Sequence, residues 1–250
     1  MFLSSKNDSE LYNNFKTIGL KDAVKNNDVL IKINLSGIYI KNHPRTDMAL
    51  LSKIVAYIHE NGGKTAITEG SAGCLTKNLI DSGFEETIDK YGVKVINVDL
   101  LDDFEKVDSY GECHYIPKCF REYPVRIAVP ATTKRVGMLY SNNVKLFVGA
   151  VPRKMYRLDS SNVPVSVPRP KLHQNLHLSV ANLFHAVKIY SDFQFYINGG
   201  LAYNENIGEF ILADTYVGDD APELDLHIFN NYFYDCDYPE YLEILKNRIK

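Results

Sequence analysis

The stretch VLIKINL at residues 29–35 begins the strand–helix–strand pattern that decides the fold. It is short, apolar and rich in β-branched residues, as is typical of a strand covered on both faces. Residues 46–63 follow a helical period, with apolar side chains at i, i+3, i+4 and i+7 from Leu51 to Ile58 and glycines at the end. Residues 64–69 form a second strand. A strand, a helix and another strand make one crossover unit with parallel strands.

The same alternation continues along the chain. Further strands are expected at 93–99, 125–130, 192–199 and 209–217, and further helices near 76–82, at 176–187 and from Pro239 onward. Residues 100–124 show no strong helical or strand periodicity. We expect them to lie outside the layers of alternating strands and helices, with a hairpin around Cys113 to Cys119. The prolines of 150–172 indicate a long ordered loop or a lid. We predict an α/β fold, a single domain over residues 1–250 with a mostly parallel central sheet flanked by helices.

Composition limits the class of protein. Of the 250 residues, 45% are hydrophobic and 24% are charged, which suits one well-filled globular domain and excludes overall disorder. A net charge of −3 lacks the footprint of a general nucleic-acid or anionic-membrane binder. The N-terminus turns polar after three residues, and no run approaches the roughly 18 apolar residues of a membrane helix. We expect a soluble, cytoplasmic protein without membrane or nucleic-acid partners.

The four cysteines bear on cofactors. They stand at positions 74, 113, 119 and 236, so no pair is separated by only two to four residues. Ferredoxin-type clusters and zinc ribbons need cysteine pairs that are this close in sequence. We therefore expect neither a zinc ribbon nor an iron–sulfur cluster. In a chain of this size the cysteines fit free thiols in a reducing cytosol.

The turn EGSAG at residues 69–73 follows a predicted strand and precedes a predicted helix. Small residues at such a turn let backbone N–H groups approach an anion near the positive end of a helix dipole. The turn matches neither a Walker loop nor the three-glycine dinucleotide pattern. An anion cradle and a tight turn that needs glycine only for its backbone angles are both consistent with it.

Basic residues gather after the strand at 125–130. Eight of the 28 Lys and Arg residues fall between positions 134 and 171, against about four for an even spread. If the strands at 29–35, 64–69 and 125–130 are neighbours, this region lies at their carboxyl ends, where open α/β sheets bind ligands. A cradle for phosphate or carboxylate and a solvated basic loop are the two interpretations.

Two further patterns concern metals. His173 and His177 are four residues apart near a helix start, but metal ligation needs a third ligand, and helix-surface histidines are the alternative. An acidic run from Asp214 to Asp225 is able to hold a divalent metal such as Mg²⁺ against a phosphate ligand, or to be a solvated loop. We assign no metal ligands.

Several segments together resemble the domain-of-unknown-function 362 family, over roughly residues 28–226. The matching segments are IKINL at 31–35, TDM at 46–48, NGGK at 61–64, TEGSAG at 68–73, PATTKR at 130–135, KLFVG at 145–149, LHQNL at 172–176, INGG at 197–200 and residues 213–225. Residues 227–250 are left as a C-terminal segment with the terminal helix. The resemblance implies an α/β fold, and relatives that carry a ferredoxin-like module differ from this chain in their cysteines.

The chain departs from the family pattern at polar positions. Arg135 stands where the family has histidine, Leu146 where it has asparagine and Asn198 where it has aspartate, and Ile33 and Met48 replace prolines. These departures favour an alternative to catalysis, a non-catalytic protein that keeps the scaffold and binds a partner or forms a homo-oligomer. Its surface would be the tyrosine-rich tail formed by Tyr232, Phe233, Tyr234, Tyr238 and Tyr241.

The leading hypothesis is an enzyme or enzyme-like binder of a small anionic metabolite that bears phosphate or carboxylate. We expect its site at the carboxyl ends of the strands, with Lys145 and Lys134 as charge partners and Glu69 or Asp214 as an acid, base or metal ligand. The residues expected to bind the ligand are Lys32, Asn34, Gly70, Ser71, Gly73, Arg153 and His173. The sequence does not specify the reaction.

Overall fold

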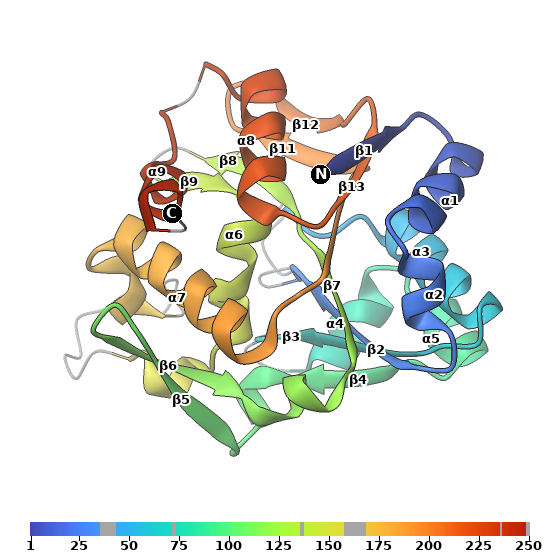
Figure 1. Ribbon diagram of the computed structural model, residues 1–250, viewed down its shortest axis with the longest axis horizontal. Coiled ribbons are helices and arrows are strands. Elements are labelled where there is room, and N and C mark those ends of the chain that lie inside the picture. Colours follow the sequence, from blue (N-terminus) through green and yellow to red (C-terminus); the bar gives the residue numbers. More distant parts are fainter. Residues whose placement is uncertain (36–43, 72–73, 136–137, 158–168, 236, 249–250) are drawn as a thin grey trace.

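The computed structural model describes residues 1–35, 44–71, 74–135, 138–157, 169–235 and 237–248 (Figure 1). The central layer is a seven-stranded sheet of order β1-β13-β10-β7-β2-β3-β4. Neighbouring strands from β10 to β4 pair in parallel, whereas β13 pairs antiparallel with β10 and with β1. The α/β class is therefore confirmed, with antiparallel pairing at one edge. The bounds are β1 Phe2–Ser5, β2 Asp28–Ile33, β3 Lys64–Glu69, β4 Lys94–Asn97, β7 Val125–Val129, β10 Phe195–Asn198 and β13 Thr215–Gly218.

The crossover unit predicted from residues 29–69 is present. Helix α3 (Met48–Glu60) joins the parallel strands β2 and β3, and the side chain of Asp47 caps it by accepting a hydrogen bond from Leu50 N–H at 2.8 Å. The apolar positions from Leu51 to Ile58 are buried, as their helical period requires. The strands at 29–35, 64–69 and 125–130 are neighbours, because β2 lies between β7 and β3.

Helices cover both faces of the sheet (Figure 1). Val29, Ile31 and Ile33 of β2 pack in one cluster with α3, whereas Leu30 packs in the other with α7. Because side chains alternate along a strand, Lys32 shares the face of Leu30. The remaining helices are α1 Asp8–Thr17, α2 Leu20–Val24, α4 Leu75–Asp81, α5 Glu85–Tyr91, α6 Asn143–Leu146, α7 Leu176–Ser191, α8 Ala221–Tyr232 and α9 Glu240–Arg248. No helix among the described residues is long and apolar enough to cross a membrane.

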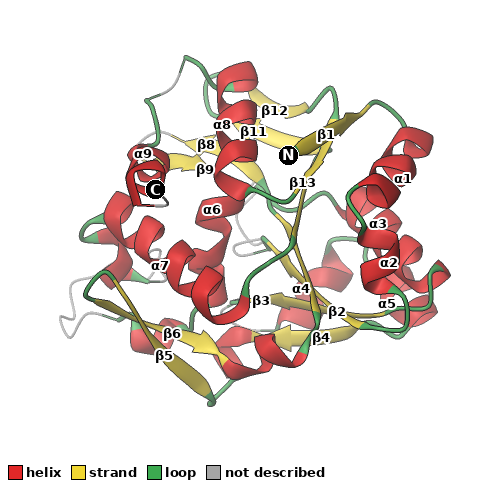
Figure 2. Ribbon diagram, in the orientation of Figure 1, coloured by secondary structure: helices red, strands yellow, loops and turns green. Residues whose placement is uncertain are grey.

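Two smaller sheets stand beside the central one (Figure 2). A four-stranded sheet has the order β12-β11-β8-β9, with bounds β8 Thr132–Arg135, β9 Met138–Ser141, β11 Leu201–Asn204 and β12 Gly208–Ile211. The prediction of one strand over 209–217 was wrong, because β12 and β13 belong to different sheets. The expected hairpin in 100–124 consists of β5 (Phe104–Ser109) and β6 (Glu112–Pro117), and it turns at Tyr110-Gly111, where both residues have positive φ, before Cys113.

The tyrosine-rich tail is divided between the core and the surface. Phe233 and Tyr241 are 0% exposed and belong to the core cluster around α7, α8 and α9, whereas Tyr234 is 77% exposed and Tyr238 is 41% exposed. The proposal that all five rings form one docking surface was therefore wrong. Phe233 and Tyr241 stabilise the packing of the C-terminal segment.

Candidate functional site

Two buried charges of opposite sign lie at the carboxyl ends of β2 and β3. The side chains of Lys32 and Glu69 are 0% and 3% exposed, and Lys32 Nζ donates to Glu69 Oε2 at 2.8 Å. Lys32 Nζ also donates to the carbonyl oxygen of Ile33 at 2.7 Å. Burial lowers the pKa of Lys32 and raises that of Glu69, and the attraction between the two charges opposes both shifts. The pair joins two strand ends and leaves no net charge.

A second set of charges lies beside this pair. Asp99, in the 3₁₀ turn η1 (Val98–Leu100) after β4, accepts a hydrogen bond from Arg153 N–H at 2.8 Å. Its other carboxylate oxygen lies 2.9 Å from Arg153 Nε. Arg169 is 2% exposed, and its Nη2 lies 3.5 Å from Asp99 Oδ1. The positive charge of Arg169 also acts to lower the pKa of Glu69. The carboxylate of Asp99 therefore forms ion pairs with two guanidinium groups, those of Arg153 and Arg169.

Two glycines allow the chain to close around these charges. Gly70 N–H donates to the carbonyl oxygen of Gly149 at 2.8 Å, so the end of β3 meets η3 (Phe147–Ala150) backbone to backbone. A Cβ at Gly149 would lie 2.2 Å from Glu69 Oε1 and 2.9 Å from Lys32 Nζ. A Cβ at Gly70 would lie 2.2 Å from Arg169 Nη2. Both positions need glycine for close approach, not for an unusual φ.

Lys145 is a cation without a carboxylate partner among the described residues. It lies on α6, which continues directly into η3, so Lys145 and Gly149 are about one helical turn apart. The side chain is half-buried, and its amine makes no hydrogen bond or ion pair with a described residue. Burial alone lowers the pKa of Lys145 to about 8. Among the described residues, this amine therefore has no counter-ion.

His173 contacts the backbone of Arg169. It lies on η5 (Pro170–His173), and its Nδ1 is 2.9 Å from the carbonyl oxygen of Arg169. Burial lowers the pKa of His173, and the charges of Lys145 and Arg169 lower it further. The ring therefore favours its neutral form. The cluster defined by Lys32, Glu69, Asp99, Lys145, Arg153, Arg169 and His173 is called the cationic cluster below.

The cationic cluster has an excess of positive charge. Its four Lys and Arg residues carry four positive charges, and Glu69 and Asp99 carry two negative ones, which leaves an excess of two with His173 neutral. In a buried setting, an unbalanced charge is costly unless a ligand balances it. The arrangement favours an anion.

In the turn at residues 69–71, the backbone N–H groups of Gly70 and Ser71 are already used in hydrogen bonds within the protein. Gly70 N–H donates to Glu69 Oε1 and Gly149, and Ser71 N–H donates to Asn97 Oδ1 at 3.2 Å. Asn78 Nδ2 donates to Ser71 Oγ at 2.7 Å, which fixes the serine as well. Gly73 lies outside the described residues. The described part of this turn therefore acts through close packing, not as a backbone cradle.

The acidic run is dispersed in the structure. Asp219 pairs with the N-terminal amine at 2.8 Å, and Asp220 caps α8. Asp225 is fully buried, and it accepts hydrogen bonds from the backbone N–H groups of Asn143 and Val144 at 3.0 Å each, at the start of α6. Burial raises the pKa of Asp225 to about 7. Within the described ranges, no group of three His, Cys, Asp or Glu side chains is placed to hold a metal ion.

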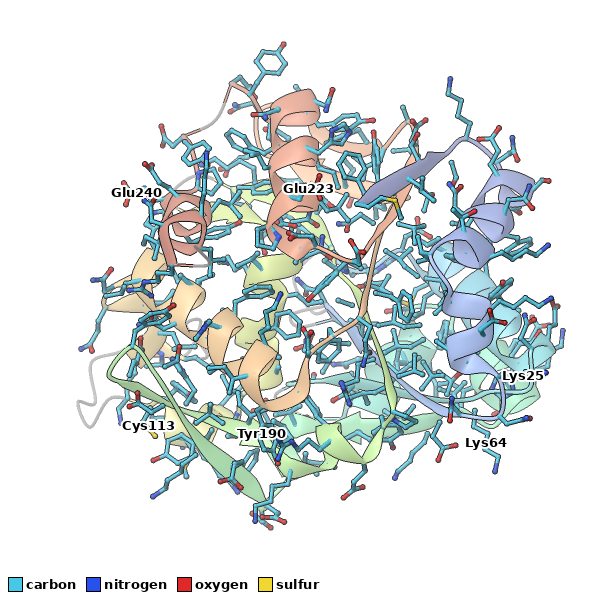
Figure 3. The ribbon with its side chains drawn as sticks, viewed as in Figure 1. Lys25, Lys64, Cys113, Tyr190, Glu223 and Glu240 are labelled. Atoms are coloured by element: carbon cyan, nitrogen blue, oxygen red, sulfur yellow. The ribbon has the colours of Figure 1, made fainter. Side chains whose placement is uncertain are left out.

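The remaining predicted residues lie in different surroundings. Lys134 is in β8 of the four-stranded sheet, where its carbonyl oxygen accepts a hydrogen bond from Glu205 N–H. Asn34 follows β2, and its backbone N–H donates to Thr46 Oγ1 at 2.9 Å. Its Oδ1 is buried and has no hydrogen-bond partner among the described residues. Cys113 is exposed on the β5–β6 hairpin (Figure 3), and burial raises the pKa of the Cys119 thiol to about 11.

Three members of the site were not predicted as site residues. Asp99 is the last residue of the strand predicted over 93–99, which is a usable signal, because strand ends carry ligand groups in this fold class. Arg169 was counted among the basic residues, but its burial depends on contacts with Val151 and Asp99 that the sequence does not show. Gly149 was quoted only as part of a resemblance.

One known protein family matches most of the chain. The family model described as "Domain of unknown function (DUF362)" matches residues 29–229, and the chain belongs to this family. No curated protein matches the chain.

Proposed function

We propose that this member of the DUF362 family binds a small metabolite bearing phosphate or carboxylate at the carboxyl ends of β2, β3 and β4, as an enzyme or enzyme-like binder. The observation that carries the proposal is the excess positive charge of the cationic cluster, with the unpaired amine of Lys145 within it. Strand ends in open α/β sheets are where such ligands bind. A phosphate or carboxylate would neutralise the excess and give Lys145 a partner.

The roles of the cluster residues differ. Lys32 and Glu69 are paired with one another, and Arg153 is paired with Asp99, so they shape the site and contribute its field. Lys145 is the group proposed to contact the anion directly. Because a charge-assisted hydrogen bond contributes about 1.5–3 kcal/mol, loss of this amine should weaken binding roughly 10-fold to 100-fold.

The test is ligand-induced thermal stabilisation of the full chain. Inorganic phosphate, pyrophosphate and citrate are the probes, with chloride at matched ionic strength as the control for screening. At a concentration of about ten times the Kd, a bound anion should add about 1.4 kcal/mol to the free energy of unfolding. At the same concentration Lys145→Met should reduce this gain to about 0.4 kcal/mol or less, whereas Lys188→Met, at an exposed lysine of α7, should retain it.

The stability of the unliganded variant separates loss of binding from loss of structure. Because Lys145 has no described partner and burial disfavours its charge, Lys145→Met should unfold at a temperature no lower than the wild type. A folded Lys145→Met protein that is stabilised by an anion as much as the wild type contradicts the proposal. So does a wild type that none of the three anions stabilises.

A further inference from the structure

The guanidinium group of Arg169 is buried with one of its ends unpaired. Its side chain is 2% exposed, and Nε donates to the carbonyl oxygen of Val151 at 2.6 Å. Nη2 lies 3.5 Å from Asp99 Oδ1 but makes no hydrogen bond with a described residue. A buried donor without an acceptor is costly, and the cost is larger for a charged group. Among the described residues, the N–H groups of Nη2 therefore lack an acceptor.

The guanidinium group of Arg153 borders the same turn. Arg153 Nη2 donates to the carbonyl oxygen of Gly70 at 3.3 Å, and a Cβ on Gly70 would lie 2.2 Å from Arg169 Nη2. Arg153 Nε is 2.9 Å from Asp99 Oδ2, but the two groups are not aligned as a hydrogen bond. Two forks of N–H donors therefore meet at Gly70, and Asp99 satisfies neither of them fully.

The unpaired donors and the excess charge favour one kind of acceptor. A water molecule would accept from these N–H groups without balancing the charge. A carboxylate group cancels one of the two excess positive charges of the cationic cluster and offers two coplanar oxygens. A phosphate monoester carries close to two negative charges at neutral pH and offers three terminal oxygens in a tetrahedral arrangement. Such a group suits guanidinium donors that approach from two sides.

We infer that Arg169 contacts the ligand directly through Nη2, with Arg153 beside it, and that the anionic group of the ligand is the dianion of a phosphate monoester. This inference rests on the proposed function, because it places the ligand in the same cationic cluster. It narrows the ligand class from phosphate or carboxylate to phosphate. Lys145 remains the amine contact proposed above, and Arg169 provides the preference for phosphate.

Isothermal titration calorimetry of the full chain tests the preference. The probes are methyl phosphate, dimethyl phosphate and malonate, at pH 7.5 and matched ionic strength. Methyl phosphate is mainly a dianion at this pH, because the second pKa of a phosphate monoester is about 6. It should bind about 10-fold to 100-fold more tightly than dimethyl phosphate, which lacks one charge and one terminal oxygen. Malonate, with its two charges on separate groups, should bind at least about 10-fold more weakly than methyl phosphate.

Two substitutions of Arg169 separate charge from geometry, and Asp99 keeps Arg153 as its counter-ion in both. Arg169→Met removes the charge and the fork, so it should weaken the binding of methyl phosphate by about 10-fold to 100-fold. Arg169→Lys keeps only the charge, so it should bind methyl phosphate and malonate with similar affinity. Arg121→Met is the matched control, because Arg121 is exposed on η2 (Lys118–Glu122). Circular dichroism checks that the variants are folded, and the ranking of the three probes by the wild type stands without them.

The outcomes distinguish the two proposals. If the wild type binds malonate or dimethyl phosphate as tightly as methyl phosphate, the preference for a phosphate monoester is refuted and the anion site is kept. If folded Arg169→Met binds methyl phosphate as tightly as the wild type, Arg169 does not contact the ligand. If none of the three probes binds to the wild type, the proposed function is refuted together with this inference.

Discussion

Replacing Lys32 by methionine should lower the free energy of unfolding by about 3–5 kcal/mol, because it leaves the buried carboxylate of Glu69 without its counter-ion. The two side chains are 0% and 3% exposed and 2.8 Å apart, so solvent is not positioned to replace the lost partner. Glu69 keeps a hydrogen bond from Gly70 N–H, and the carbonyl oxygen of Ile33 loses the donor that lay 2.7 Å away. The methionine has nearly the same length, which keeps the change in packing small.

A second substitution separates charge from packing. In Lys32→Met/Glu69→Gln the buried group is neutral, and the glutamine amide has the vacated carbonyl of Ile33 as an acceptor. The double variant should therefore be more stable than Lys32→Met alone by about 2 kcal/mol. The deficit of Lys32→Met should also shrink at low pH. Removing the lysine raises the folded-state pKa of Glu69 further. The stability that the protonated Glu69 carboxyl contributes is therefore present at low pH and is lost as the pH rises through that pKa.

Urea denaturation followed by circular dichroism measures these changes. Lys77→Met is the matched control, because Lys77 forms an exposed ion pair with Asp81, and its loss should cost no more than about 0.5 kcal/mol. A cost below about 1 kcal/mol for Lys32→Met, or a double variant less stable than Lys32→Met, would refute the view that an uncompensated buried charge dominates at this position.

Three further predictions follow from the packing. Gly149→Ala should destabilise the protein by about 1–3 kcal/mol in urea denaturation, because the new Cβ would lie 2.2 Å from Glu69 Oε1; wild-type stability would contradict it. Burial raises the folded-state pKa of Asp225 from 3.8 to about 7, so the stability that its protonated form contributes should fall as the pH rises from about 4 to about 7, and this part of the pH dependence should be absent from Asp225→Asn. Phe233→Ala should cost about 3–5 kcal/mol and Tyr234→Ala less than about 0.5 kcal/mol, since the first ring is buried and the second exposed; equal losses in thermal unfolding would show that the tail packs otherwise.

The β2–α3–β3 unit was predictable because its signals are local. Alternation, helical period and the caps at Asp47 and Asn61 lie within about 40 consecutive residues, and each is a property of neighbouring side chains. The first 28 residues lack such a signal. Helix α1 buries only Leu11 and Phe15, and β1 is a four-residue edge strand whose partner, β13, is more than 200 residues away. Short elements stabilised by distant contacts leave little trace in their own sequence.

The same reasoning explains the strand predicted over 209–217. An apolar run with β-branched residues indicates extended backbone, but it does not specify which sheet the backbone joins. Residues 208–211 pair with β11 in the four-stranded sheet, and residues 215–218 pair with β10 and β1 in the central sheet. The division at Leu212 to Asp214 follows from tertiary pairing, which periodicity along one strand does not contain.

The candidate site shows why charge along the chain is a poor guide to charge in space. The basic run at 134–171 and the acidic residues near position 100 were separate features of the sequence, yet Arg153 pairs with Asp99 and Lys154 pairs with Asp102 in the fold. With Arg169, whose guanidinium lies 3.5 Å from Asp99, three of the eight basic residues of the run are therefore paired with carboxylates of a segment some fifty or more residues earlier. Lys145, in contrast, has no carboxylate partner among the described residues, and the buried carboxylate of Asp225 accepts hydrogen bonds from backbone N–H groups of α6. Lys145 is thus a half-buried member of the run that the long-range ion pairs leave without a carboxylate, and that property appears only when the long-range contacts are known.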